Sequence, residues 1–211
     1  MRLVCLSDQH GHLPDHLPEG DVLVLGGDLC PIDDHAIAAQ AAWLDGPFRA
    51  WLEGAGFARI VGIAGNHDFV FEAGRQPRDL PWTYLQDGAA DIAGVSFYGF
   101  PWTPILGPWA FEATPAQMQG HLAHLTAAPD VLVAHGPPGG CLDRTWRGER
   151  VGSLEVRAAV LHHAPRLVVS GHIHEAHGRA RLGSTEVVNA SLLDERYEPV
   201  FTPVVVDLPV E

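Results

Sequence analysis

Carboxylate, imidazole and amide side chains recur along the chain in short clusters, each placed directly after an apolar run. Such a mixture of oxygen and nitrogen donors, with no thiolate required, suits five- or six-coordinate Mn, Fe, Zn or Co better than a tetrahedral structural zinc. The cluster residues are Asp8, His10, Asp28, Asn66, His67, Asp68, His135, His172 and His174.

These donors are too many for one ion, whereas two ions that share a carboxylate would use them. Two metal ions roughly 3.5 to 4 Å apart are the recurrent arrangement for hydrolysis of phosphate esters and diesters. We therefore expect a dinuclear metal site that acts on phosphate esters.

The apolar runs are rich in β-branched residues, and each ends abruptly in one of the polar clusters, as a buried strand followed by a loop does. They span residues 3–6, 22–25, 60–63, 131–134 and 167–170. Helices are expected over residues 33–53, 115–127 and 153–163, with Pro115 in a first turn and Ser153 as an N-cap. Alternation of strands and helices predicts an α/β core, in which ligands bind beyond the carboxyl ends of the strands.

The remaining segments predict a second sheet and a loop region. Residues 185–189 and 200–206 are strand-like without an intervening helix, so antiparallel or mixed strands are expected near the C-terminus. Residues 69–111 are rich in Pro, Gly and Trp, with one strand-like run at 95–100, and we interpret them as functional loops. Gly27, Gly65 and Gly171 precede expected ligands, where positive φ or a close backbone approach is expected.

Length and composition indicate one folded domain over residues 1–211, with 46% hydrophobic and 18% charged residues. The formal net charge of −13 argues against extended nucleic acid as a partner, whereas a small phosphate-ester substrate fits a local cationic site. No apolar run is long enough to cross a membrane or to resemble a signal peptide. Three widely spaced cysteines are typical of reduced thiols, so a cytoplasmic protein is expected. A homodimer is left open.

Five motifs in a fixed order carry a family resemblance. The chain contains D-x-H, G-D, G-N-H-D, a single His and G-H-x-H between Asp8 and His174. This order resembles the calcineurin-like metallophosphoesterase family. The resemblance implies an α/β fold, a four-layer α-β-β-α sandwich with two mixed sheets, and a dinuclear metal site at the C-terminal ends of the strands.

The resemblance also implies a role for each motif residue. Two divalent ions would be bound, chosen from Mn, Fe, Zn or Co with Mn or Fe favoured, and a metal-bridging hydroxide would attack phosphorus in line. His67 would protonate the leaving oxygen or stabilise the transition state, and Asp68 would orient the His67 ring. Asp28 would bridge the two ions. One ion would be held by Asp8, His10, Asp28 and His174, and the other by Asp28, Asn66, His135 and His172.

The branch of the family bears on the substrate. Residues 28–31 read Asp-Leu-Cys-Pro and lack the Asp-Arg-Gly element of the family's protein Ser/Thr phosphatases. Residues 98–104, 135–138 and 171–178 resemble the small class III cyclic-nucleotide phosphodiesterase and metallophosphoesterase-domain subgroup. This likeness implies small phosphodiesters, cyclic nucleotides among them, with Trp102 or a neighbouring aromatic beside the base.

Three alternatives stay open. A phosphomonoesterase or nucleotidase would use the same site, and a catalytically silent protein-binding scaffold would be expected to lack part of the ligand set. A nuclease would need a basic groove, for which 13 Lys and Arg are few. The histidines outside the motifs, including His35 and His121, are interpreted as surface or helix-face residues. No carboxylate partner is evident for His121, and His177 is expected to have a structural or supporting role.

Overall fold

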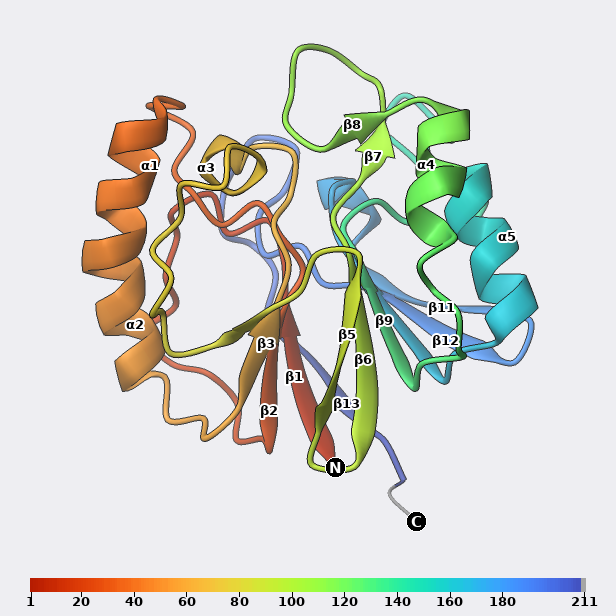
Figure 1. Cartoon of the computed structure of the whole chain (residues 1–211), viewed down its shortest axis with the longest axis horizontal. Coiled ribbons are helices and arrows are strands. Elements are labelled where there is room, and N and C mark those ends of the chain that lie inside the picture. The colour runs from red at the N-terminus through yellow and green to blue at the C-terminus, as the bar shows by residue number, and fades with distance from the viewer. Residues whose placement is uncertain (210–211) are drawn as a thin grey trace.

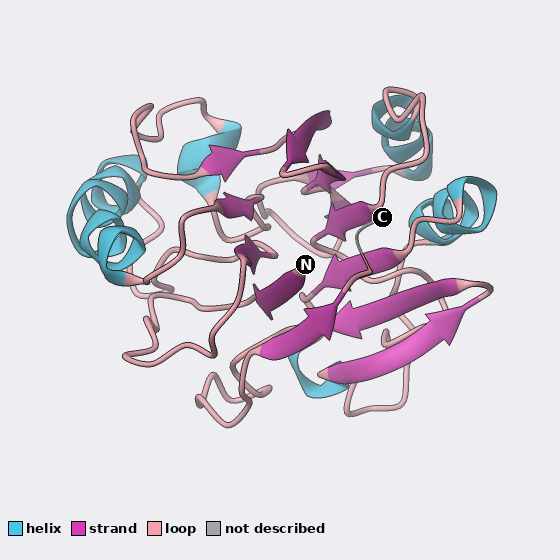
Figure 2. Ribbon diagram, turned by 90° about the horizontal axis from the view of Figure 1, so that it is seen from below, coloured by secondary structure: helices cyan, strands magenta, loops and turns pink. Residues whose placement is uncertain are grey.

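The computed structural model describes residues 1–209 as two mixed β-sheets packed face to face, with helices against both outer faces (Figure 1). Viewed from below, the two sheets lie between the helices on either side (Figure 2). The predicted four-layer α-β-β-α sandwich is confirmed. Within the described residues, no helix combines the length and the apolar character needed to cross a bilayer.

The first sheet contains the strands that precede the first three polar motifs. Its neighbouring strands β1 to β4 are parallel, and β13 pairs antiparallel with β1 at one edge. In sheet order the strands are β13 (Val204–Asp207), β1 (Arg2–Leu6), β2 (Val22–Leu25), β3 (Ile60–Gly62) and β4 (Thr83–Tyr84).

The second sheet contains the strands that precede the last two motifs. Its four middle strands are parallel, and an antiparallel strand closes each edge. In sheet order the strands are β11 (Gly178–Leu182), β12 (Thr185–Asn189), β10 (Leu167–Ser170), β9 (Val131–Ala134), β6 (Val95–Phe100) and β5 (Gly88–Ile92). A separate short pair joins β7 (Thr103–Pro104) to β8 (Glu112–Ala113).

Helices cover the outer face of each sheet. The first sheet is covered by α1 (Ile37–Trp43), the π-helical turn η1 (Leu44–Phe48) and α2 (Arg49–Gly54), and the second by α4 (Pro115–Leu122) and α5 (Leu154–His163). The short helices α3 (Phe69–Glu72) and η2 (His174–Ala176) lie beside the motif loops. Ser153 caps α5 by accepting a hydrogen bond from the Val156 N–H, and Pro115 occupies the first turn of α4, as predicted.

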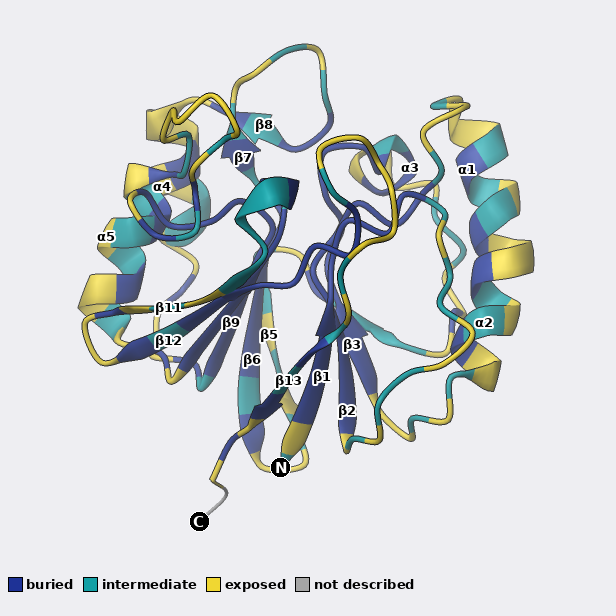
Figure 3. Cartoon of the chain, turned by 180° about the vertical axis from the view of Figure 1, so that it is seen from behind, coloured by how far each residue is buried: buried dark blue, intermediate teal, exposed yellow. Residues whose placement is uncertain are grey.

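Three apolar layers hold the sandwich together. Val24 and Val61 of the first sheet meet Phe97, Val133 and Val169 of the second in the layer between the sheets. The other two layers lie between each sheet and its helices. Apart from the short edge strand β4, the parallel strands are buried over most of their length, while the outward faces of the helices are exposed (Figure 3). Burial on both faces explains why the parallel strands appear as continuous apolar runs.

Several predicted boundaries need correction. The helix expected over residues 33–53 starts at Ile37 and contains the π-helical turn around Pro47, which has no N–H to continue the regular ladder. The helix expected over residues 115–127 ends at Leu122. Residues 69–111 form α3, β4, β5 and β7 in addition to the predicted strand β6. The strand expected over residues 200–206 spans Val204–Asp207.

The two C-terminal strands lie in different sheets. β12 joins the second sheet beside β10, whereas β13 crosses to the first sheet and pairs with β1. The antiparallel partner of β12 is β11, which the sequence patterning did not predict because its residues Gly-Arg-Ala-Arg-Leu include no β-branched or aromatic side chain.

Candidate metal centre

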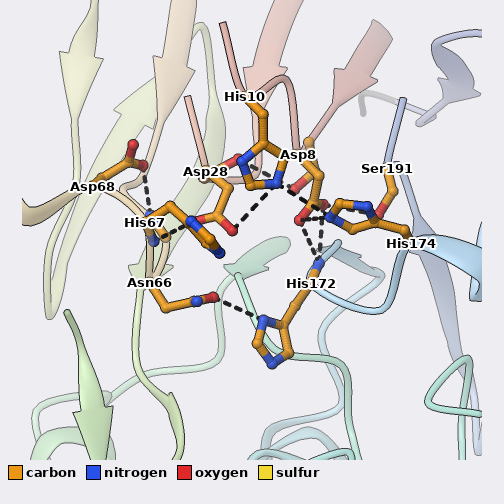
Figure 4. A network of polar contacts seen from close by, with 12 residues as sticks. Asp8, His10, Asp28, Asn66, His67, Asp68, His172, His174 and Ser191 are labelled. Atoms are coloured by element: carbon orange, nitrogen blue, oxygen red, sulfur yellow. Dashed lines mark hydrogen bonds and ion pairs between the residues drawn. The ribbon is translucent and has the colours of Figure 1, made fainter. Parts of the chain in front are cut away.

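All seven predicted metal ligands lie beyond the carboxyl ends of strands, and both sheets contribute. The loops after β1, β2 and β3 carry the ligands of the first sheet, and the loops after β9 and β10 carry those of the second. Because the sheets face each other, the ends of their parallel strands meet at one end of the sandwich (Figure 1). The fold therefore brings residues from 8 to 174 into one cluster (Figure 4).

The backbone at the ligands is conformationally strained. Asp8, His10, Asp28 and His172 have φ values of 53°, 45°, 53° and 65°, in the left-handed region that residues other than glycine seldom adopt. Such strain costs of order 1 to 3 kcal/mol per residue and persists where the surrounding structure imposes it. The strand exits therefore turn sharply enough to direct these side chains into the cluster.

Two glycines make room for the ligands. A Cβ atom at Gly171 would lie 1.9 Å from Oδ2 of Asp8, and a Cβ atom at Gly65 would lie 2.3 Å from Oδ1 of Asp28. Both distances are far below van der Waals contact. The expected close backbone approach is therefore present at these two positions.

The first group of donors consists of Asp8, His10 and His174. Nε2 of His10 lies 3.2 Å from Nε2 of His174, which is 3.3 Å from Oδ1 of Asp8. All three residues are buried, and their candidate ligand atoms lie within 4.8 Å of one another. Imidazole nitrogens that converge on a carboxylate oxygen form a donor set suited to a divalent transition metal.

The second group gathers around Asn66 and His135. Oδ1 of Asn66 lies 3.0 Å from Nε2 of His135 and 2.8 Å from Nδ1 of His172. Oδ2 of Asp28 lies 3.4 Å from Nε2 of His135. These are the four residues that the family resemblance implies for the second ion.

Asp28 lies between the two groups. Its Oδ2 faces His135 on one side and Nε2 of His10, 3.6 Å away, on the other, while its Oδ1 accepts a hydrogen bond from the His67 N–H. Asp8 also lies near both groups, but both of its oxygens already accept hydrogen bonds from the His172 N–H, and Ser191 donates to Oδ2. Asp28 is therefore the carboxylate better placed to be shared by two ions.

Backbone carbonyls orient the histidine ligands. Nδ1 of His135 donates to the Gly26 carbonyl at 2.8 Å, and Nδ1 of His174 donates to the Asp194 carbonyl at 2.9 Å. With the proton on Nδ1, each ring presents the lone pair of Nε2 to the cluster. The donor types and their orientation fit two divalent ions.

Burial and charge set the protonation states of the cluster. Burial disfavours the charged form of His135, yet attraction to Asp28 raises its pKa to about 9. Burial lowers the pKa of His10 to about 3 and that of His172 to about 4. Burial opposes ionisation of Asp28 too, but the His135 charge holds the pKa of that carboxyl well below its usual range. Ions that bind here therefore meet an ionised Asp28 and displace a proton from His135.

His67 lies at the edge of the cluster with its backbone held at both ends. Its N–H donates to Asp28 and its carbonyl accepts from Nε2 of Gln40 at 2.7 Å. The ring of Trp109 covers the His67 ring, with a centroid distance of 4.3 Å, and the His10 ring meets it edge-on with a centroid distance of 4.8 Å. His67 therefore lies beside the donors, and its role as an acid stays a prediction.

Asp68 was expected to orient the His67 ring, but no hydrogen bond joins its carboxylate to that ring. Its carboxylate accepts hydrogen bonds from the backbone N–H groups of Leu29, Cys30 and Gly65 at 2.8 to 3.1 Å. Burial and the neighbouring Asp28 raise its pKa to about 6. Asp68 instead ties the loop after β2 to the loop after β3.

Other aromatic and histidine predictions also change. The indole N–H of Trp102 donates to Asp87, and its ring stacks on His121 at 3.8 Å, so Trp102 packs within the protein. Contrary to expectation, His121 has a carboxylate partner, because its Nδ1 lies 2.8 Å from Oδ2 of Asp87. His177 has the expected structural role, because its Nδ1 donates to the Ser191 carbonyl.

Several residues beside the metal centre lie outside the sequence motifs. Nε2 of His35 lies 3.3 Å from Nδ1 of His67, and Trp109 contacts both of these rings. Tyr197 meets His10 and His174 edge-on at 4.9 and 5.1 Å. These residues come from irregular loops, so no periodic pattern or strand end identifies them in the sequence. The three cysteines are buried free thiols.

Known proteins resemble this chain over most of its length. The family model described as Calcineurin-like phosphoesterase matches residues 1–176. Metallophosphoesterase domain-containing protein 1 of Homo sapiens is 32% identical over 240 residues, which cover 99% of this chain and 71% of that protein. A UPF0046 protein of Caenorhabditis elegans is 29% identical over an alignment that covers 100% of this chain and 82% of that protein.

A solved structure shares the fold. The structure of TT1561 of Thermus thermophilus aligns with this chain with a TM-score of 0.60 and 19% sequence identity. The alignment covers 89% of this chain and 88% of the TT1561 chain. The motif order, the converging donors and the family-model match agree. The chain therefore belongs to the calcineurin-like phosphoesterase family, whose members hydrolyse phosphate esters with the help of divalent metal ions.

Proposed function

We propose that this chain hydrolyses small phosphodiesters that carry an aromatic group, of which cyclic nucleotides are the leading example. The observation that carries the proposal is an aromatic cavity that opens onto the metal centre. This cavity of about 200 Å³ is lined by His172 and His174 together with Trp146 and Tyr197. Trp146 and Tyr197 are 68% and 40% exposed, so a substrate can reach both residues.

The side chains of the cavity provide binding surface beside the reacting phosphate. The backbone N–H of Trp146 donates to Glu175 at 2.6 Å, and Glu175 follows the ligand His174 directly in the chain. Trp146 is therefore anchored to the loop that carries two metal ligands. An aromatic ring pair is worth about 0.5 to 1.5 kcal/mol beyond the area it buries, enough to prefer a nucleobase over a small alkyl group.

The charge of the cavity supports a diester over a monoester. Glu175 and Glu195 line the same cavity as the two histidines, and the described part of this lining includes no Lys or Arg. At neutral pH a phosphodiester carries one negative charge and a monoester close to two. A less charged substrate is repelled less by the two carboxylates.

Within this proposal the chain's own residues divide the work. Two bound divalent ions would supply an activated water and would offset charge on the phosphoryl oxygens. Asp8, Asp28, Asn66 and the four ligand histidines would hold those ions, and the hydrogen bond from the buried His67 N–H to Oδ1 of Asp28 keeps that carboxylate in place. His67, fixed beside the cluster, offers Nε2 to the leaving oxygen.

The test compares bis-p-nitrophenyl phosphate with p-nitrophenyl phosphate as substrates of chelator-stripped protein, with and without added Mn²⁺. We expect hydrolysis that Mn²⁺ restores and that is faster on the diester, followed by turnover of cyclic nucleotides in a screen. Faster hydrolysis of the monoester would replace the proposal with a phosphomonoesterase or nucleotidase. Absence of turnover in protein that binds two ions would replace it with a protein-binding scaffold.

A further inference from the structure

His35 occupies a defined position against the ring of His67. Nε2 of His35 lies 3.3 Å from Nδ1 of His67, and the two ring centroids are 5.4 Å apart. The half-buried His35 ring also meets Phe69 and Trp109 edge-on, each at 5.5 Å. The contacts with Phe69 and Trp109 therefore hold the His35 ring in place beside His67.

No other group in residues 1–209 competes for Nδ1 of His67. Asp68 is occupied by three backbone N–H groups, and His35 is the hydrogen-bond partner of Nδ1 within this part of the chain. Asp28 and Gln40 hold the backbone of His67 on both sides. The remaining freedom of His67 is rotation of its side chain, and the contact with His35 restricts it.

A hydrogen bond between two imidazoles requires one nitrogen to donate and the other to accept. A ring that protonates a leaving oxygen from Nε2 gives up that proton as the P–O bond breaks, keeps the electron pair on Nε2, and retains its other proton on Nδ1. The matching partner at Nδ1 is therefore a hydrogen-bond acceptor, a role that carboxylates fill in other catalytic histidine pairs. Nε2 of His35 can fill it.

We propose that His35 is a positioning residue that accepts a hydrogen bond from the Nδ1–H of His67 and so directs Nε2 of His67 towards the leaving oxygen. The catalytic consequence rests on the proposed hydrolytic function, whereas the hydrogen bond itself does not. In a neutral His67 ring, acceptance by His35 selects the Nδ1–H tautomer, which free histidine disfavours relative to the Nε2–H form.

The first experiment reads the tautomer by NMR and needs no turnover. Protein labelled with ¹⁵N-histidine and loaded with Zn²⁺ is examined at a pH where the His67 ring is neutral. We expect a protonated Nδ1 in the wild type, a predominantly Nε2–H ring in His35→Phe, and recovery of the Nδ1–H form in His35→Gln, whose carbonyl can accept. An Nε2–H ring in the wild type, or the same tautomer in the wild type and His35→Phe, overturns the proposal.

The second experiment compares leaving groups in protein that hydrolyses diesters. His35→Phe should lower kcat about tenfold or more for phenyl esters, whose leaving group needs a proton, and change it little for p-nitrophenyl esters. KM and bound metal should not change, and His35→Gln should recover most of the rate. His124→Phe, the same substitution at an exposed residue in the turn after α4, is the control. Equal losses on both esters in His35→Phe would contradict positioning.

Discussion

Replacing Gly171 by alanine tests whether the close approach of the backbone to Asp8 positions this metal ligand. The added Cβ would lie 1.9 Å from Oδ2 of Asp8 and 2.0 Å from Oγ of Ser7. Ordinary van der Waals contact begins at 3.4 Å, so the Asp8 oxygen must retreat by about 1.5 Å. Because φ of Gly171 lies outside the left-handed region, the cost arises from lack of space and not from backbone conformation.

The retreat should disturb the ligand and its supporting hydrogen bonds together. Asp8 accepts from the His172 N–H at 2.9 Å and from Oγ of Ser191 at 2.8 Å, and a hydrogen bond to a charged group is worth about 1.5 to 3 kcal/mol. Loss of a supporting contact lowers metal affinity by about 10- to 100-fold, and displacement of the ligand itself should cost at least as much. Overpacking should also destabilise the fold by about 1 to 3 kcal/mol.

The assay is Mn²⁺ binding by calorimetry, together with thermal unfolding of the metal-free protein. Gly120→Ala is the matched control, because a Cβ at this position in α4 meets nothing within 4 Å. It should leave metal binding unchanged and raise stability by about 0.4 to 1 kcal/mol. Unaltered Mn²⁺ affinity in Gly171→Ala would refute the idea that this glycine keeps Asp8 in place.

The remaining predictions concern the bridge, the acid, the aromatic cavity and the core. Asp28→Ala should abolish diester hydrolysis and reduce the bound metal measured by elemental analysis, because it removes the carboxylate that faces both donor groups. Full activity with unchanged metal content would contradict this prediction. His67→Ala should retain both metals and lose about 100-fold or more in kcat for phenyl esters, with a smaller loss for p-nitrophenyl esters, and a metal-free variant would argue against its role as an acid. Trp146→Ala should raise KM for nucleotide esters about 2- to 10-fold while Trp146→Tyr does not, and equal KM values would remove Trp146 from the substrate site. Phe97→Ala, in the layer between the sheets, should lower the free energy of unfolding by about 3 to 5 kcal/mol in a urea titration, and a loss below about 1 kcal/mol would show that this layer is not tightly packed.

Sequence patterning predicted the parts of this protein that depend on local or periodic signals. A strand buried on both faces must be apolar throughout, so five strands and the polar residues that end them could be located from the order of residue types. The N-cap at Ser153 depends only on the next few residues, and it was predicted for that reason. The four-layer arrangement followed from the resemblance carried by the motifs.

Contacts between loops could not be predicted in this way. The proximity of His35 to His67 depends on how the segment between β2 and α1 folds back, and nothing periodic marks it. Asp68 is adjacent in sequence to His67, yet its carboxylate points to N–H groups of another loop, because a side chain's partners depend on the space around it.

Sequence alone therefore determined which donors gather at the strand ends, because alternation of buried strands and polar ends is encoded residue by residue. Tertiary structure alone decided which groups orient those donors, which aromatic rings face the cavity, and that the last strand pairs with the first. These features depend on packing between segments up to about two hundred residues apart, such as Arg2 and Asp207, whose relative positions are set only when both sheets have closed on their common core.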